Sequence, residues 1–219
     1  MPADAVIAFE PRKTPVQARS TVTVEAISEA TIQVLLNHGV ERLTTTRVAQ
    51  RAGVSVGTLY QYYPNKQSLL FAVLENHLNN VIARVEATCA GACHKPLAEM
   101  IKEMVEAFVD AKMKRADISV ALYRVGVDVG GPALIKRINQ RSRKTVEAML
   151  ETASDIKSPP DKFAIDIMLS AMAGAMRSLL ENGPSLTTVR KAREQLVLLC
   201  QSYMAAATAK RDESTRRGC

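Results

Sequence analysis

The stretch TTTRVAQRAGVSVGTLYQYYPNK, Thr44–Lys66, decides the fold that this sequence predicts. It places Tyr60, Tyr62 and Tyr63 within four residues, although the whole chain has five Tyr, four Phe and no Trp. Threonine, serine and glycine surround these tyrosines. Three tyrosines clustered in a polar stretch indicate that these side chains have a specific function.

Two short helices and a tight turn account for the first part of this stretch. Thr44 can cap a helix that runs to Ala52, and Gly53 can end it. Ser55 can cap the next helix, which must end before Pro64. Two such helices crossing at a steep angle form a helix-turn-helix, whose second helix enters the major groove of DNA.

The second helix has one apolar face and one polar face. Leu59 and Tyr63 lie four residues apart and should share the inner face. Thr58, Gln61 and Tyr62 then point outward. A glutamine amide can pair with adenine, and a threonine methyl can touch a thymine methyl.

The remaining features of the stretch suit the DNA backbone. A tyrosine hydroxyl can bind a phosphate oxygen without a flexible stem. Gly57 lets the backbone come close to DNA, and Lys66 adds a cation at the start of the following helix. The alternative interpretation is a helical hairpin buried in a core, with incidental tyrosines.

Charge permits a nucleic-acid partner. The formal net charge is +7, and no Asp or Glu occurs from Arg42 through Leu74. A polyanion could approach that segment without meeting a fixed negative charge. A chance acid-poor loop is the alternative.

The rest of the chain predicts helices only, so the fold class is all-α. Apolar residues recur at steps of three and four, and Gly and Pro pairs separate the segments. We expect helices over 19–37, 44–52, 55–63, from 65 or 66 onward through 85, and near 97–109, 117–127, 132–154, 160–182 and 185–208.

The helix-turn-helix residues resemble those of the TetR-type bacterial transcriptional regulators. The resemblance covers about residues 19–75. It is carried by Gly39, Leu43-Thr44-Thr45, Val48-Ala49, Ala52-Gly53-Val54-Ser55, Gly57-Thr58-Leu59-Tyr60, Tyr62-Tyr63 and Lys66.

This resemblance implies a homodimeric repressor that binds a double-stranded DNA operator and is released by an unknown small-molecule effector. It implies an N-terminal three-helix helix-turn-helix domain and a C-terminal helical ligand-binding and dimerisation domain. We expect a flexible basic arm over 1–18, the DNA-binding domain over 19–66, the effector and dimer domain over 67–208 and a basic tail over 209–219.

The DNA contacts are expected around the two short helices. Many family members carry Arg where this chain has Thr46, and here the arginine is one residue later. Because one residue turns a helix by about 100°, Arg47 is expected to bind phosphate, which puts base reading from this helix in doubt. The predicted DNA-binding residues are Thr44, Thr45, Thr46, Arg47, Ser55, Val56, Gly57, Thr58, Tyr60, Gln61, Tyr62 and Lys66. Arg12, Lys13 and Arg19, near the start of the first helix, either contact phosphates or the minor groove, as in related proteins, or belong to a disordered basic tail with no defined contact.

Two further sites are predicted in the second half of the chain. Small residues and methionines on the helix 160–182, with the helix 185–208, predict a four-helix dimer interface or, alternatively, an internal core. The interface candidates are Met168, Ala171, Met172, Ala175, Leu196, Leu199 and Tyr203. The effector-pocket candidates, for which core packing is the alternative, are His77, Met100, Met104, Phe108, Tyr123, Arg124 and Met149.

Other functional classes are less favoured. Cys89, Cys93 and His94 suggest a thiol or metal site, but the spacing matches no common zinc pattern. We expect no catalytic residues, no metal and no cofactor, and we expect a cytoplasmic protein without a membrane span. The alternatives are a constitutive DNA-binding regulator without ligand response, or a helical binding module or enzyme.

Overall fold

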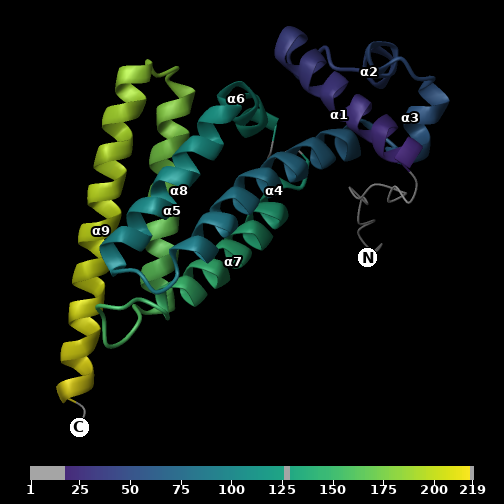
Figure 1. Ribbon diagram of the computed structural model, residues 1–219. Coiled ribbons are helices and arrows are strands. Elements are labelled where there is room, and N and C mark those ends of the chain that lie inside the picture. Colours follow the sequence, from purple (N-terminus) through teal and green to yellow (C-terminus); the bar gives the residue numbers. More distant parts are fainter. Residues whose placement is uncertain (1–17, 126–128, 218–219) are drawn as a thin grey trace, which may run out of the picture. The chain divides into compact units, whose positions relative to one another are not determined.

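The computed structural model describes residues 18–125 and 129–217. These residues form nine helices, and none of them lies in a strand. The all-α fold is therefore confirmed (Figure 1). The helices are α1 (Ala18–His38), α2 (Thr45–Ala52), α3 (Val56–Tyr62), α4 (Lys66–Ala92), α5 (Leu97–Lys114), α6 (Ala116–Val125), α7 (Gly131–Leu150), α8 (Lys162–Glu181) and α9 (Leu186–Arg217).

Most predicted boundaries agree with the structure to within two residues, and four helix ends differ more. Helix α4 continues to Ala92 and helix α5 to Lys114, beyond the predicted 85 and 109. Helix α7 ends at Leu150, where a run of turns begins, rather than near 154. Helix α9 continues through Arg217, so much of the predicted tail 209–219 is helical. Arg211 within this extension donates to the Pro159 carbonyl at 2.6 Å, which gives the longer helix an anchor. Most of the predicted arm, with Arg12 and Lys13, lies outside the described residues.

The chain divides into two compact units. Unit 1 contains residues up to Leu78 together with Asp117–Leu134, and unit 2 contains Asn79–Ala116 and Ile135 onward. Helix α6 therefore groups with α1, α2 and α3 rather than with the later helices. The predicted boundary between the DNA-binding domain and the effector and dimer domain, at 66/67, does not coincide with the division into these two units. It stays a prediction.

Unit 1 is built on packing between α1 and α2 and between α2 and α3. Ile27, Val48 and Leu59 are fully buried, one from each of these helices. The Thr31 hydroxyl, also buried, donates to the Ile27 carbonyl at 2.7 Å, so this polar group has a partner inside the core. These contacts give two very short helices a fixed support.

Unit 2 is a layer of long helices in which α9 packs against both α5 and α8. The apolar stripe predicted on the helix near 97–109 is buried in α5. Two connections brace each other at one end of the layer. Asp155 Oδ1 accepts from the Leu97 N–H at 2.7 Å, and the Ser154 N–H donates to the Lys95 carbonyl at 3.1 Å.

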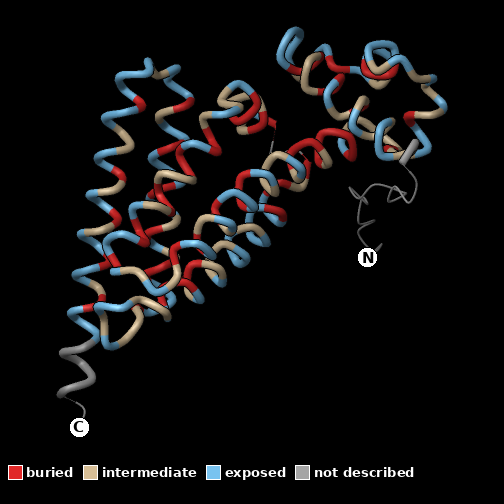
Figure 2. Tube along the Cα trace, viewed as in Figure 1, coloured by how far each residue is buried: buried red, intermediate tan, exposed pale blue. Residues whose placement is uncertain are grey.

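Helix α8 is long and apolar enough to span a membrane by length and composition. Its surroundings are those of a packed helix instead. Asp166 forms an ion pair with Arg143 of α7 at 2.8 Å, and one face, with Ile165, Met172 and Met176, is buried within unit 2. Figure 2 shows buried positions recurring along α8 and α9 with exposed positions between them.

Lys112 is a basic residue inside unit 2. Its side chain lies in α5 and is only 6% exposed, and burial lowers its pKa to about 8. Between this value and the usual lysine pKa, the unfolded chain binds a proton that the folded chain does not. Stability from this group therefore rises as the pH rises from about 8 toward 10.5.

We predict that Lys112→Met stabilises the protein at pH 7, by up to about 3 kcal/mol, because a buried charge is removed. The advantage over wild type should shrink at pH 9 and again at pH 10. Urea unfolding at the three pH values measures it, with the exposed Lys102→Met on the same helix as control. An advantage that does not change with pH contradicts this account.

Candidate nucleic-acid interface

Helix α2 begins and ends as its sequence predicts. Thr44 is extended, and its side chain accepts from the Arg47 N–H at 3.3 Å. Gly53 adopts a left-handed conformation with φ of 69°, which is unfavourable for residues with a side chain. The next N–H, that of Val54, then donates to the Ala49 carbonyl at 3.0 Å. This geometry turns the chain sharply into α3.

Helix α3 is fixed from its inner face. Ser55 caps it by accepting from the Thr58 N–H at 2.9 Å. Leu59 is 0% exposed and Tyr63, directly after the helix, is 4% exposed, which confirms the predicted inner face. Burial, and then the neighbouring Tyr62, raise the pKa of Tyr63, so this phenol stays neutral.

The outer face of α3 is accessible. Gln61 is exposed and Tyr62 is half-buried. Tyr60 is 43% exposed, and its hydroxyl lies 3.1 Å from the Thr45 hydroxyl at the start of α2. The Thr58 hydroxyl lies 2.8 Å from Ser55 Oγ, which leaves its methyl group as the simpler route to a base contact.

Gly57 on α3 is not required by the fold. A Cβ built there meets only Ser55 Oγ, at 3.7 Å, which is an ordinary contact. Its φ is not positive, so backbone strain does not demand glycine either. A glycine at an exposed position with room for a side chain fits a close approach by an external backbone.

Arg47 points toward the connection between α1 and α2. Its Nη1 donates to the Arg42 carbonyl at 3.0 Å, whereas the neighbouring Thr46 is exposed. This position is compatible with the predicted role of Arg47 at phosphate. The structure thus gives this arginine a defined anchor that spacing alone did not predict.

Lys66 lies at the first turn of α4. Its Nζ donates to the Val40 carbonyl at 2.5 Å. The start of α4 is closed by a reciprocal cap, because Asn65 Oδ1 accepts from the Ser68 N–H at 2.7 Å and Ser68 Oγ accepts from the Asn65 N–H at 3.2 Å. The pattern Asn-x-x-Ser before an apolar run is a signal for such a cap that the sequence reading did not use.

All twelve predicted DNA-binding residues lie in unit 1. All of them are exposed or half-buried, and the contact between the Thr45 and Tyr60 hydroxyls connects α2 with α3. Arg42 is a further basic residue at this surface, and sequence reasoning did not assign it to DNA. Its place in the acid-free segment 42–74 was the available signal.

The seven predicted ligand residues are divided between the units. Four of them are buried in unit 2, and His77, Tyr123 and Arg124 belong to unit 1. His77 Nε2 lies 2.9 Å from the hydroxyl of Ser119 on α6, within unit 1. The four in unit 2 are Met100, Met104, Phe108 and Met149.

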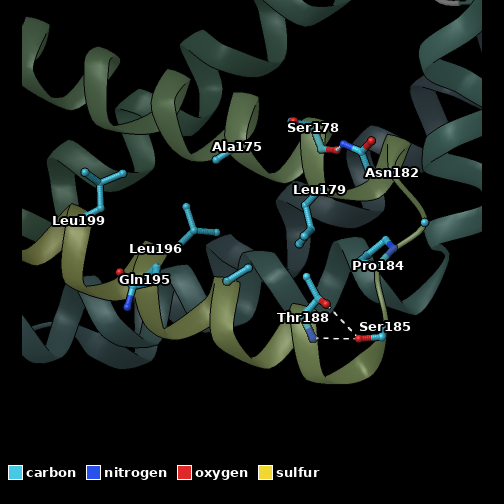
Figure 3. A pocket seen from close by; sticks show the side chains of 12 residues that line it. Ala175, Ser178, Leu179, Asn182, Pro184, Ser185, Thr188, Gln195, Leu196 and Leu199 are labelled. Atoms are coloured by element: carbon cyan, nitrogen blue, oxygen red, sulfur yellow. Dashed lines mark hydrogen bonds between the residues drawn. The ribbon is translucent and has the colours of Figure 1, made fainter.

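The predicted interface residues also divide into two groups. Met168, Met172 and Leu196 are at most 5% exposed and pack in the core of unit 2, as the internal-core alternative describes. Residues available on the surface of α8 and α9 are Ala171, Ala175, Leu199 and Tyr203. An open groove of about 720 Å³ lies on this surface near the turn between α8 and α9, and Ala175, Leu196 and Leu199 are among its lining residues (Figure 3).

The paired cysteines lack the features of a reactive site. Cys89 is 2% exposed, and burial, followed by Cys93 and Glu86, raises its pKa to about 12. Its thiolate is therefore strongly disfavoured. Among the described residues, no group of three or more His, Cys, Asp or Glu side chains is arranged to hold a metal ion.

Comparison with known proteins agrees with this geometry. Residues 27–73 match the family model described as bacterial regulatory proteins, tetR family, and residues 96–204 match the tetracyclin repressor-like C-terminal domain. This chain belongs to the TetR family. The TetR-family assignment makes it a DNA-binding transcriptional regulator rather than an enzyme.

Individual relatives share parts of the TetR-family chain or its fold. The nucleoid occlusion factor SlmA of Pasteurella multocida is 28% identical over 102 residues, which are 47% of this chain and 50% of SlmA. The chain thus spans about half the length of this curated relative, and less of several others.

Solved structures of low identity support the TetR fold. A tetR-family regulatory protein from Rhodococcus RHA1 has a TM-score of 0.65 and 21% identity, covering 83% of this chain and 96% of the other. LfrR from Mycobacterium smegmatis, solved in complex with proflavine, has a TM-score of 0.54 and 21% identity, covering 87% and 98%.

We predict that Tyr62→Phe combined with Lys66→Ala weakens DNA binding at least tenfold. The Tyr62 hydroxyl, which would donate to a DNA phosphate, and the Lys66 cation are lost together. Fluorescence anisotropy with a labelled duplex measures this. Gln67→Ala, next to Lys66 and exposed, is the control and should bind like wild type. Equal binding by the double variant and the control contradicts the assignment of these two contacts.

Proposed function

We propose that this TetR-family protein is a homodimeric repressor that recognises a two-fold symmetric DNA operator and is released by a small apolar effector. The proposal that the protein recognises a DNA sequence rests on one observation: α3 has a buried inner face and an exposed polar outer face. Its inner face is fixed by buried Leu59 and Tyr63, while Gln61 and Gly57 are exposed. A short rigid helix with an accessible polar face suits the major groove.

Repression follows from occupancy of the DNA. In a two-fold symmetric dimer, two copies of α3 would enter successive major grooves about 34–36 Å apart. A dimer held on both grooves excludes other proteins from the same stretch. We therefore expect a palindromic operator whose half-sites are separated by one helical turn or a multiple of it.

The exposed faces of α8 and α9 support the homodimer. Phe163 is 70% exposed and Leu198 is 56% exposed, which is unusual for large apolar side chains in an isolated subunit. Gly174 on the exposed side of α8 has open space where a Cβ would lie. The fold of one subunit does not require this glycine, but close approach of a helix from a second copy would.

The core of unit 2 supports an apolar effector. Met100, Met104 and Met149 are buried there together with Phe108, and methionine side chains adapt their shape to a bound molecule. The relative LfrR is described in complex with proflavine, so a ligand-bound state has been solved for this fold. Arg124 is exposed and His77 bonds to Ser119 within unit 1, which makes both weaker candidates for ligand anchors.

Release would require that effector and DNA prefer different conformations. The effector would favour a state in which α4 shifts and the two copies of α3 no longer match the groove spacing. A constitutive regulator is the alternative, and it predicts that no small molecule weakens DNA binding. We place the protein in the cytoplasm, where DNA and metabolites are both accessible.

Selection of bound sequences from a random duplex pool tests the function. We expect enrichment of a palindrome, and binding to it should weaken steeply as salt increases because phosphates are neutralised. Metabolite fractions are then screened for release of the selected duplex. Failure to enrich any sequence contradicts sequence-specific regulation, and enrichment of an asymmetric site contradicts the dimer.

We predict that Gly174→Leu shifts the protein from dimer to monomer, because a large side chain prevents two helices from meeting closely. Analytical ultracentrifugation measures the change, and circular dichroism checks that helix content is retained. Gly91→Leu, at another exposed glycine with open space on α4, is the matched control and should remain dimeric. A dimer with unchanged affinity in Gly174→Leu contradicts the proposed interface.

A further inference from the structure

Lys112 is a charged side chain in the buried core of unit 2. Among residues 20–125 and 129–211, it is the one buried residue with a charged side chain, and it is 6% exposed. The other buried polar side chains carry hydroxyls, which can bond within their own helix. Thr31 and Thr208, for example, each donate to the carbonyl four residues earlier. A lysine ammonium inside an apolar core requires a different reason.

The position of Lys112 on α5 is central to the buried face of this helix. Ile101, Val105 and Phe108 precede it by eleven, seven and four residues, which are the steps of a single helix face. All three are buried. Lys112 therefore lies in the middle of this face, and its low exposure means that its stem does not carry the ammonium out to water.

The end of α5 does not account for this burial. A cation in the last turn of a helix is favourable near the free carbonyls, and the last turn of α5 contains both Lys112 and Lys114. Lys114 is exposed, so it supplies this charge while remaining hydrated. The helix end therefore needs no second, buried lysine.

Burial of Lys112 costs the folded protein stability. It lowers the pKa of Lys112 to about 8, so the contacts that the ammonium makes within the folded chain do not compensate for its lost hydration. An amine with this pKa is still mainly protonated at pH 7. The core of unit 2 thus holds a cation whose charge is incompletely balanced, and groups that cost stability in this way are concentrated at functional sites.

Apolar side chains that can change shape precede Lys112 on the same helix. Met104 lies eight residues earlier, about 12 Å along the helix axis, and Met100 lies one turn before Met104. Both are 0% exposed. Methionine side chains are flexible and adapt to a bound molecule. A molecule lying along α5 from Lys112 toward Met100 would meet a cation at one end and an apolar surface over the rest.

We propose that Lys112 is the anchor for the effector, and that the effector is an elongated, mainly apolar molecule with a single carboxylate. The carboxylate accepts hydrogen bonds from the Lys112 ammonium, and the apolar part lies among Phe108, Met104 and Met100. One carboxylate balances one buried ammonium, whereas a phosphate dianion would leave a surplus negative charge in the core. This inference rests on the proposed function, because it adds a charged group to the apolar effector proposed there.

The test compares carboxylates with amides of the same shape, which lack the charge. Octanoate and octanamide form one pair of probes, and phenylbutyrate and phenylbutyramide form the other. Isothermal titration calorimetry measures their binding to the whole chain at pH 7. Wild type should bind the carboxylate of at least one pair tenfold or more tightly than its amide, as expected for a charge-assisted hydrogen bond in a buried site.

Lys112→Met should abolish this preference while the amides bind as well as before or better, because the apolar surface is kept. The variant is expected to be more stable than wild type, and circular dichroism checks that it is folded. Lys112→Gln, which keeps a polar side chain without the charge, should also lose the preference. Lys102→Met removes the same charge from an exposed position on α5. It is the matched control and should keep the preference of wild type.

Three results would overturn the anchor. The first is equal affinity of wild type for the carboxylate and the amide of each pair, and the second is a carboxylate preference that survives in Lys112→Met and Lys112→Gln. The third is that neither carboxylate binds wild type at millimolar concentration. A purely structural role of Lys112 would change the melting temperature but not the ratio of carboxylate to amide affinity.

The anchor and the proposed function can fail separately. The same probes are added to the protein on its selected operator, and fluorescence anisotropy measures DNA release. If a carboxylate binds through Lys112 but does not release the operator, the anchor stands and effector-controlled release through this site fails. If an amide releases the operator as well as its carboxylate does, in both wild type and Lys112→Met, release stands and the anchor fails.

Discussion

The inner packing of α3 is the constraint on which the rest of unit 1 depends. A helix of seven residues is not stable alone in water, and Leu59 and Tyr63 hold it against the core instead. Replacing a buried leucine by alanine typically costs 2–5 kcal/mol, so this anchoring is large relative to the whole stability of a domain. Because packing of the inner face offsets the conformational entropy that is lost when α3 forms, the residues on its outer face can be polar. Ser55 and Gly53 only set where the helix begins and how the chain enters it.

Electrostatic interactions within unit 1 add to this apolar packing. The carbonyls of the α1–α2 turn attract Arg47 from one helix and Lys66 from another. Side chains that would otherwise be flexible are thereby positioned before any partner arrives. Unit 2 relies mainly on apolar packing, and Lys112 is an exception inside it.

Local signals made the fold and the two short helices of the candidate site predictable. Caps at Thr44 and Ser55 and the left-handed Gly53 are properties of single residues in their chain neighbourhood, and they correctly placed the two short helices. The tether from Lys66 to Val40 joins residues 26 apart, so spacing carried no information about it. The same holds for Met168, whose burial depends on which side of α8 meets the core of unit 2. Helical periodicity marks an apolar face but does not say whether its own chain or a second copy covers it.

The central claim is that α3 reads bases through Thr58 and Gln61, and the ratio of operator affinity to scrambled-duplex affinity tests it most directly. The ratio is measured for Thr58→Ala, Gln61→Ala and wild type at one salt concentration. The account predicts that each variant loses roughly tenfold or more on the operator, as expected for a lost base contact of 1–3 kcal/mol, while binding to the scrambled duplex stays constant. An unchanged ratio in both variants contradicts base reading by α3.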